Sequence, residues 1–226
     1  MKQHIEIWNH FCEHHNVQKT LVPLFNTLPN GNVLTKRIGN AKVRNVLCRD
    51  DSMEEVVRRE CAKLISDWHE RAFIYDGLLY IMAVKEGDGV APLYIGKAET
   101  IGKRNGNLSA NIKGIEHDTS KFARWGDGYE YHIGDLSAAV LPGHDQIHIE
   151  RKYQMWAAAL FKNYPSETPT LRRPVYFWAK AWSSSDLGPW EDFGPTRLTF
   201  LEYLLIGLAS SAFPGLLLNR EGHNRK

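Results

Sequence analysis

Cysteine is scarce in this sequence, which has three cysteines among 226 residues and no CxxC pair. Cys12, Cys48 and Cys61 form an odd and scattered set, which is not the framework of a disulfide-stapled protein. Thiols stay free in reducing compartments, so we predict a cytoplasmic protein.

Long hydrophobic runs are also missing. The N-terminal stretch MKQHIEIWNHFCEHHN has no apolar core of the signal-peptide kind. The most apolar stretch, LEYLLIGLASSAF, is interrupted and too short to cross a bilayer. We therefore expect no membrane partner.

No excess of one charge marks the chain, whose formal net charge is +2 with 24% charged and 43% hydrophobic residues. This is the composition of an ordinary globular protein, and it does not by itself indicate nucleic-acid binding. A chain of this length can bury a real core, either as one domain with elaborations or as a catalytic domain with a small helical one.

The chain begins with a segment, residues 1–73, that we predict to be mainly helical. Within it, residues 52–71 have helical spacing, and Ser52 with Glu55 forms a capping-box pattern. From residue 74 onward, short strands alternate with helices. We predict strands at 77–84, 93–98, 129–141 and 175–182, a loop at 85–92, and helices at 144–161 and 196–213.

The last predicted helix has clear boundaries. Thr196 is its expected N-cap, and Pro214 with Gly215 ends it. The whole pattern predicts an α/β (α+β) fold, with a small mixed or antiparallel sheet flanked by helices.

Two short tyrosine motifs lie on the first two predicted strands after residue 74. LLY ends at Tyr80, and YIG begins at Tyr94. Together they resemble the paired motifs of the GIY-YIG nuclease family, in which two neighbouring strands each contribute a tyrosine to one site. The YIG motif matches verbatim, whereas in the first motif either Leu78 replaces the glycine or Gly77 is displaced by one position.

Further elements of the family pattern follow in order. The family carries an arginine on the helix after the second motif, and Arg104 lies ten residues after Tyr94. Lys97 matches a basic position found in some members. The family also has a glutamate on a late helix and an asparagine beyond it, which correspond here to Glu202 and Asn219.

These residue types suit the hydrolysis of a phosphodiester bond, in which a water loses a proton and charge on the phosphate is neutralised. Glu202 offers a hard oxygen ligand for Mg²⁺ (or Mn²⁺), and Arg104 a charged fork for phosphate oxygens. A tyrosine with a pKa near ~10 needs a cation to act as a base, and Lys97 and Arg104 are candidates. Gly96 permits close approach of backbone and substrate. The resemblance implies that Asn219 braces the site.

Plainer interpretations stand beside these. A tyrosine on an apolar strand is usually a core residue with a satisfied hydroxyl. Arg124 is a rival phosphate ligand, and His132 and His117 are candidate helpers, although most lone histidines are structural. Glu150 is a rival glutamate, but no Leu-Asn pattern follows it, so we interpret it as a surface or helix-start charge.

Two polar clusters of the N-terminal segment have open interpretations. The first groups possible zinc ligands: His4, His10, Cys12, His14 and His15. Their spacing matches no standard finger, so exposed helix histidines are the default. The second groups basic residues in LTKRIGNAKVRN: Lys36, Arg37, Lys42 and Arg44. These either contact a DNA backbone or belong to a solvated loop.

The length and layout favour a type II restriction endonuclease within this family. The resemblance implies a nuclease domain over residues 74–226, with an insertion at about 137–195 that supplies recognition surface. Double-stranded DNA is the expected partner, and a homodimer would suit a palindromic site with two equivalent strands. The alternatives are a nuclease for branched, damaged or phage DNA, and a non-catalytic DNA-binding module with the same fold.

Overall fold

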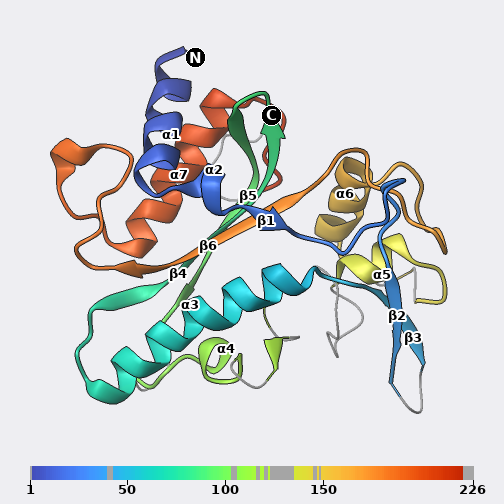
Figure 1. Cartoon of the computed structure of the whole chain (residues 1–226), viewed down its shortest axis with the longest axis horizontal. Helices are drawn as coiled ribbons and strands as arrows, with labels where there is room; N and C mark the ends of the chain where they lie inside the picture. The colour runs from blue at the N-terminus through green and yellow to red at the C-terminus, as the bar shows by residue number, and fades with distance from the viewer. Residues whose placement is uncertain are drawn as a thin grey trace.

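The computed structural model describes residues 2–39, 43–102, 106–115, 118–119, 122, 135–144, 147 and 149–220. A four-stranded antiparallel sheet has the order β1-β6-β4-β5, and a second sheet pairs β2 with β3 (Figure 1). The strands are β1 Val22–Pro23, β2 Thr35–Ile38, β3 Arg44–Leu47, β4 Tyr75–Glu86, β5 Gly89–Glu99 and β6 Tyr176–Ser183. The helices are α1 Lys2–His14, α2 Val17–Thr20, α3 Asp51–Glu70, α4 Ala110–Lys113, α5 Leu136–Val140, α6 Arg151–Leu160, α7 Leu198–Ala212 and the 3₁₀ helix η2 Glu191–Phe193. This architecture confirms the predicted α/β fold class.

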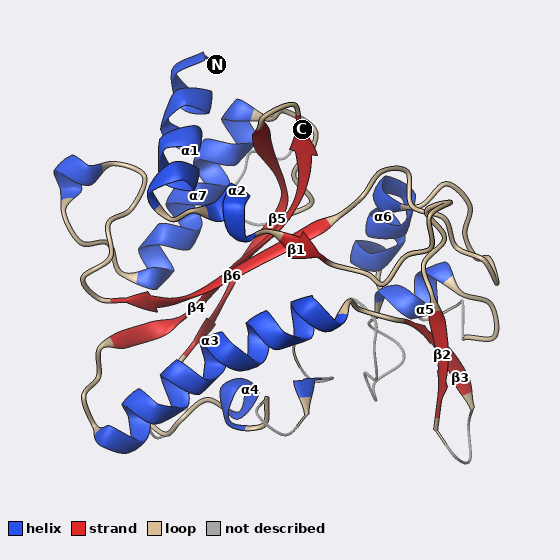
Figure 2. Cartoon of the chain, in the orientation of Figure 1, coloured by secondary structure: helices blue, strands red, loops and turns tan. Residues whose placement is uncertain are grey.

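The main sheet separates two hydrophobic cores, and helices cover both of its faces (Figure 2). Successive residues of β4 alternate between these cores. Leu78 belongs to the core under α3, α5 and α6, and Leu79 belongs to the core under α1 and α7. Within the described ranges, no helix combines the length and apolar character that crossing a bilayer requires.

Strands β4 and β5 form one long hairpin. Their pairing continues up to Glu86 and Gly89, so the turn contains only Gly87 and Asp88. Gly87 has a φ of 58°, a left-handed conformation that two-residue hairpin turns require and glycine tolerates. The prediction of a loop over 85–92 is therefore wrong, because the Gly- and Asp-rich signal marks a tight turn and its flanking residues continue the ladder.

Residues 136–140 also differ from the prediction, which placed them in a strand over 129–141. They form α5, whose N-cap Asp135 accepts a hydrogen bond from the backbone N of Ser137. All five residues of α5 are buried. A wholly buried apolar run does not distinguish helix from strand by its periodicity, so the strand prediction is wrong here. Residues 129–134 lie outside the described part of the chain.

The boundaries predicted for the N-terminal segment and the insertion cut across the main sheet. The range 137–195 contains β6, which pairs with both β1 and β4. Only α5, α6 and the adjoining loops of that range can be additions to the sheet. Likewise, residues 1–73 contain three strands beside α1, α2 and α3, and one of these strands, β1, belongs to the main sheet.

The starts of two helices are set by aspartates. Asp50 is the N-cap of α3, and its carboxylate accepts a hydrogen bond from the backbone N of Ser52 at 3.0 Å. At α7, Thr196 does not cap the helix. Asp76 of β4 does so from a distant part of the chain, because its carboxylate accepts a hydrogen bond from the backbone N of Leu198 at 3.0 Å. The beginning of α7 is thereby fixed to the beginning of β4.

His15, just after α1, connects that helix to β6. Its ring lies between those of Phe11 and Trp182, with centroid distances of 4.7 and 4.9 Å. Its Nε2 is 2.9 Å from the carbonyl oxygen of Leu187, and its Nδ1 is 3.2 Å from Nζ of Lys180. The Lys180 ammonium donates to Nδ1, so the neutral ring carries its proton on Nε2.

We expect acid to destabilise the fold through His15. Burial is the main cause that lowers the pKa of His15 from 6.5 to about 4, and the nearby Lys180 and His14 lower it further. The Leu187 carbonyl and Asp186 act in the opposite direction and raise this pKa. When folding lowers the pKa of a histidine, the neutral ring stabilises the fold at pH values above the pKa of the unfolded state. This stabilisation is lost as the pH falls from the unfolded-state pKa through the folded-state pKa. Because solvent screens the partly exposed ring, we expect protonation of His15 to lower the unfolding free energy by about 1–2 kcal/mol between pH 6.5 and 4. Urea unfolding at about pH 7 and 4.5 should show a smaller loss for His15→Gln than for wild type, and equal losses would contradict the assignment.

Candidate active site

Tyr80 and Tyr94 lie on the same face of the β4–β5 hairpin. Both pack against the core under α3, α5 and α6, because alternate residues of each strand point to that side. Their ring centroids are 6.3 Å apart, and the ring of Phe122 packs edge-on against Tyr80 at 5.1 Å. The structure thus brings the two motif tyrosines together, as the resemblance implies.

Gly96 is the direct cross-strand partner of Tyr80. A Cβ at this position would lie 2.6 Å from Cε2 and Cζ of Tyr80 and 2.7 Å from its hydroxyl oxygen. The Tyr80 ring therefore lies flat over the backbone of β5, the edge strand of the sheet. The close approach expected at Gly96 is made by this ring.

Glu202 lies on α7, the helix that covers the other face of the sheet. The buried stripe of that helix includes Leu201 and Leu205, and Glu202 is half-buried beside it. Burial raises the pKa of Tyr80 well above its ordinary value, and Tyr94, Glu202 and Tyr153 raise it further. The charge of Glu202 is thus one of the influences on Tyr80, and with its pKa raised Tyr80 stays protonated as a hydrogen-bond donor.

Helix α6 contributes residues that the sequence did not indicate. Nζ of Lys152 lies 5.2 Å from the ring centroid of Tyr94, 5.5 Å from that of Tyr153 and 5.1 Å from that of Trp156. Trp156 also packs on Tyr94, with a centroid distance of 5.0 Å. Three aromatic faces around one ammonium form a cation–π arrangement. No local motif announces it, because α6 lies far from both tyrosine motifs in the chain.

Asn219 braces the backbone of β5 between Tyr94 and Gly96. Its side-chain oxygen accepts a hydrogen bond from the backbone N of Ile95 at 3.0 Å, and its side-chain nitrogen donates to the Ile95 carbonyl at 2.7 Å. Asn219 is 7% exposed. The segment after α7 thus satisfies part of the open edge of β5, in the bracing position that the resemblance implies.

Lys97 lies on the opposite face of β5 from Tyr94, on the side of α7, since residues alternate along the strand. It forms an ion pair with Glu99. Glu99 also accepts a hydrogen bond from the hydroxyl of Thr199 at 2.8 Å. This geometry ties β5 to the first turn of α7 and does not place Lys97 beside the tyrosine rings.

Three predicted site residues, Arg104, Arg124 and His132, lie outside the described residues, as does His117. The rival glutamate, Glu150, is exposed at the N-cap position of α6. Of the predicted set, the structure therefore brings together both tyrosines, Gly96 and Asn219, and the charge of Glu202 raises the pKa of Tyr80.

Over the described ranges, no group of three or more His, Cys, Asp or Glu side chains can hold a metal ion. Among the described residues, Glu202 therefore offers a sparse set of protein ligands. Such a set suits Mg²⁺, which keeps several waters and takes one or two protein carboxylates. It does not suit Zn²⁺, which needs three or four protein ligands.

The histidines of α1 make other contacts. Nε2 of His10 and Nδ1 of His14 are 2.9 and 3.4 Å from the same Glu191 oxygen of η2. Cys12 is buried, and burial raises its pKa to about 12. These contacts join α1 to the η2 loop.

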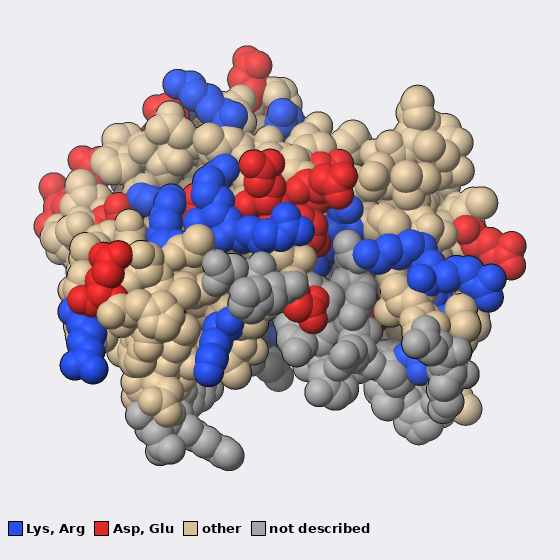
Figure 3. Space-filling view, turned by 60° about the horizontal axis from the view of Figure 1, so that its bottom comes forward, with Lys and Arg blue, Asp and Glu red and all other residues tan. Residues whose placement is uncertain are grey.

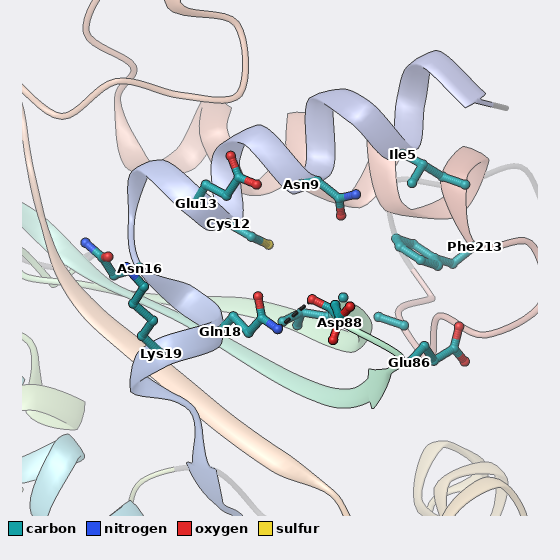
Figure 4. A pocket seen from close by; sticks show the side chains of 13 residues that line it. Ile5, Asn9, Cys12, Glu13, Asn16, Gln18, Lys19, Glu86, Asp88 and Phe213 are labelled. Carbon is teal, nitrogen blue, oxygen red and sulfur yellow. Dashed lines mark hydrogen bonds between the residues drawn. The ribbon is translucent and has the colours of Figure 1, made fainter.

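A cavity of about 590 Å³ lies between α1, α2 and the tip of the β4–β5 hairpin (Figure 4). Its walls include Cys12, Glu86 and Phe213, and Gln18 donates a hydrogen bond across it to the Asp88 carbonyl. None of its described lining residues belongs to the tyrosine–glutamate cluster. The cavity is separate from the candidate active site.

Comparison with models of known protein families found no match, and searches of curated proteins and of solved structures found none either.

Proposed function

We propose that this chain is a metal-dependent DNA endonuclease of the GIY-YIG type and that it acts as a site-specific type II restriction enzyme. One observation carries the proposal: the two motif tyrosines share one face of the β4–β5 hairpin, and the charge of the helix-borne Glu202, far away in the chain, raises the pKa of Tyr80. A half-buried carboxylate on an apolar helix is costly to desolvate, which favours a role for Glu202 beyond packing. The same set suits water activation and charge stabilisation at a phosphodiester.

Each side chain has a role in this proposal. Glu202 would hold Mg²⁺ or Mn²⁺, and the bound metal would supply stabilisation of the leaving oxygen of the phosphodiester. Tyr80, kept protonated by burial, donates a hydrogen bond to a phosphate oxygen. The tyrosinate form of Tyr94, which the Lys152 ammonium stabilises, accepts the proton of the attacking water and becomes the neutral hydroxyl. Arg104 neutralises the phosphate charge, as the family resemblance implies.

Replacing Lys152 by methionine should lower the single-turnover cleavage rate by about 10- to 100-fold. The ammonium favours the anionic form of Tyr94, so its removal should shift the rising limb of the pH–rate profile to higher pH. Lys152→Arg should restore most of the rate, because it keeps the charge. Arg151→Met, at the exposed neighbouring position, is the matched control. A Lys152→Met enzyme with an unchanged pH profile would remove Lys152 from the mechanism.

The proposed function is tested by incubating the purified protein with a mixed-sequence plasmid, with Mg²⁺ or with EDTA. Discrete, Mg²⁺-dependent fragments would support a site-specific endonuclease and give its recognition site by end mapping. Nicks or a smear would favour a structure- or damage-directed nuclease instead. Absence of cutting on plasmid, branched and nicked DNA, together with binding to them, would favour a non-catalytic DNA-binding module.

A further inference from the structure

We infer that the β2–β3 ribbon enters the major groove of duplex DNA and reads its sequence. The inference rests on the proposed function, since it identifies the surface through which such a nuclease would select its site. Strands β2 and β3 pair only with each other among the described strands, and they extend together away from the main sheet (Figure 1). The major groove is wide enough to admit a two-stranded ribbon.

The register of the ribbon gives its two faces different chemistry. Arg37 pairs with Asn45, so these two side chains share one face. Ile38 pairs with Arg44, and Lys36, two residues before Ile38, lies on that other face. Arginine and asparagine are the side chains that bond guanine and adenine edges bidentately. Cations on the second face suit the phosphates that flank the groove.

The exposure of the ribbon fits this use. Lys36 and Arg37 are exposed, and Arg44 and Asn45 are half-buried. Figure 3 brings the lower side of Figure 1 forward, and it shows Lys and Arg side chains at the end of the molecule where the ribbon lies, as well as across the middle of this face. The chain as a whole carries a net charge of only +2, so a local concentration of cations is a more specific signal than the composition.

Hydrogen bonds anchor the base of the ribbon to neighbouring elements. The backbone N of Leu47 donates to the Ser137 hydroxyl at 3.1 Å. Arg49, which is 3% exposed, donates to Glu54 at 2.5 Å and to the Thr119 carbonyl at 2.8 Å. Since α3 begins two residues after Arg49, the ribbon is joined to the body through a buried ion pair. A pre-organised reading element loses little entropy on binding.

A second explanation of the charges is that they protect the exposed edge of β2 from pairing with other chains. The two explanations differ in what they expect from a charge-removing variant. If the charges only protect the edge of β2, the charge-removing variant should self-associate and keep its affinity for DNA. If the ribbon enters the groove, the variant should bind DNA more weakly. Its affinity should also depend less on salt concentration, because binding releases fewer counterions.

The experiment compares wild type, Arg37→Gln/Arg44→Gln and the control Lys2→Gln/Lys19→Gln, which removes the same charge from exposed positions at α1 and α2. The probe is a fluorescein-labelled 30-base-pair duplex of mixed sequence, titrated in EDTA at several salt concentrations. We expect the ribbon variant to bind at least ~10-fold more weakly, with a log–log salt slope smaller in magnitude by about 1 to 2, and the control to match wild type. Equal affinity of wild type and ribbon variant would overturn the inference alone. Failure of wild type to bind any duplex would overturn the proposed function as well.

Reading is tested separately by mapping the plasmid fragments that Arg37→Ala produces. Loss of a bidentate contact with a base weakens the discrimination between base pairs at one position of the recognition site. We therefore expect Arg37→Ala to cleave additional sites that wild type leaves intact. An unchanged fragment pattern would assign Arg37 to phosphate contact and overturn the reading role.

Discussion

Replacing Glu202 by glutamine is expected to lower the cleavage rate at least ~10³-fold, because a metal-ligand carboxylate contributes several kcal/mol to the transition state. The amide keeps the size of the side chain but loses its charge. Glu202 is half-buried beside the apolar stripe of α7, so the substitution leaves the packing of Leu201 and Leu205 intact. DNA affinity should change by less than about threefold, since electrostatic contact with the DNA backbone sets most of the affinity.

Single-turnover nicking in Mg²⁺ and duplex binding in EDTA measure the two quantities separately. Glu150→Gln is the matched control, because Glu150 is exposed at the start of α6 and is the rival glutamate of the sequence. It should cleave at the wild-type rate. Persistent cutting by Glu202→Gln would exclude Glu202 as the metal ligand. Inactivity of Glu150→Gln would indicate that Glu150, at the N-cap position of α6, is the ligand instead.

The local parts of the site were predictable from the sequence, because short-range chemistry determines them. The apolar runs around Tyr80 and Tyr94 predict strands, and the verbatim YIG motif indicates which tyrosine the second strand presents. The helix that carries Glu202 has strong apolar content and a Pro-Gly end. Each of these signals lies within a few residues of the structure that it predicts.

Features that depend on register or on distant contacts could not be predicted in this way. Lys97 is two residues from Glu99 in the chain, but the strand direction and the position of α7 decide that it pairs there and not with a tyrosine. The α7 cap comes from Asp76, which belongs to β4. Lys152 reaches Tyr94 only because α6 packs over this face of the hairpin. Contacts of this kind follow from tertiary packing and leave no periodic signal.

The strand predicted over 129–141 failed for a related reason. Residues 136–140 are buried on every side, so they show neither the alternation of a half-buried strand nor the 3.6-residue period of an amphipathic helix. Asp135 decides the outcome locally, because its carboxylate caps the first turn of α5. An Asp-x-Ser pattern before a short apolar run is the signal that could have indicated a helix.

Substituting alanine for Gly96 is expected to lower the cleavage rate at least ~10²-fold while destabilising the fold by only about 1 to 3 kcal/mol. The new Cβ would lie 2.6 Å from the Tyr80 ring, so the ring has to turn away from β5. Phe122 and Tyr94 pack against that ring and limit where it can go. A displacement of about 1 Å at the Tyr80 hydroxyl is enough to misplace a donor in the transition state.

A double-mutant cycle separates this route from a direct effect of Gly96 on the substrate. In a Tyr80→Ala background, the added methyl group meets no ring, so Gly96→Ala should cost little further activity. The control is Gly207→Ala on α7, where a Cβ would meet nothing within 4 Å; it should keep wild-type activity and gain up to about 1 kcal/mol of stability. Gly96→Ala could instead lower the cleavage rate by the same factor with and without the Tyr80 ring. That result would mean that Gly96 is needed for the approach of DNA to the β5 backbone and does not act by positioning Tyr80.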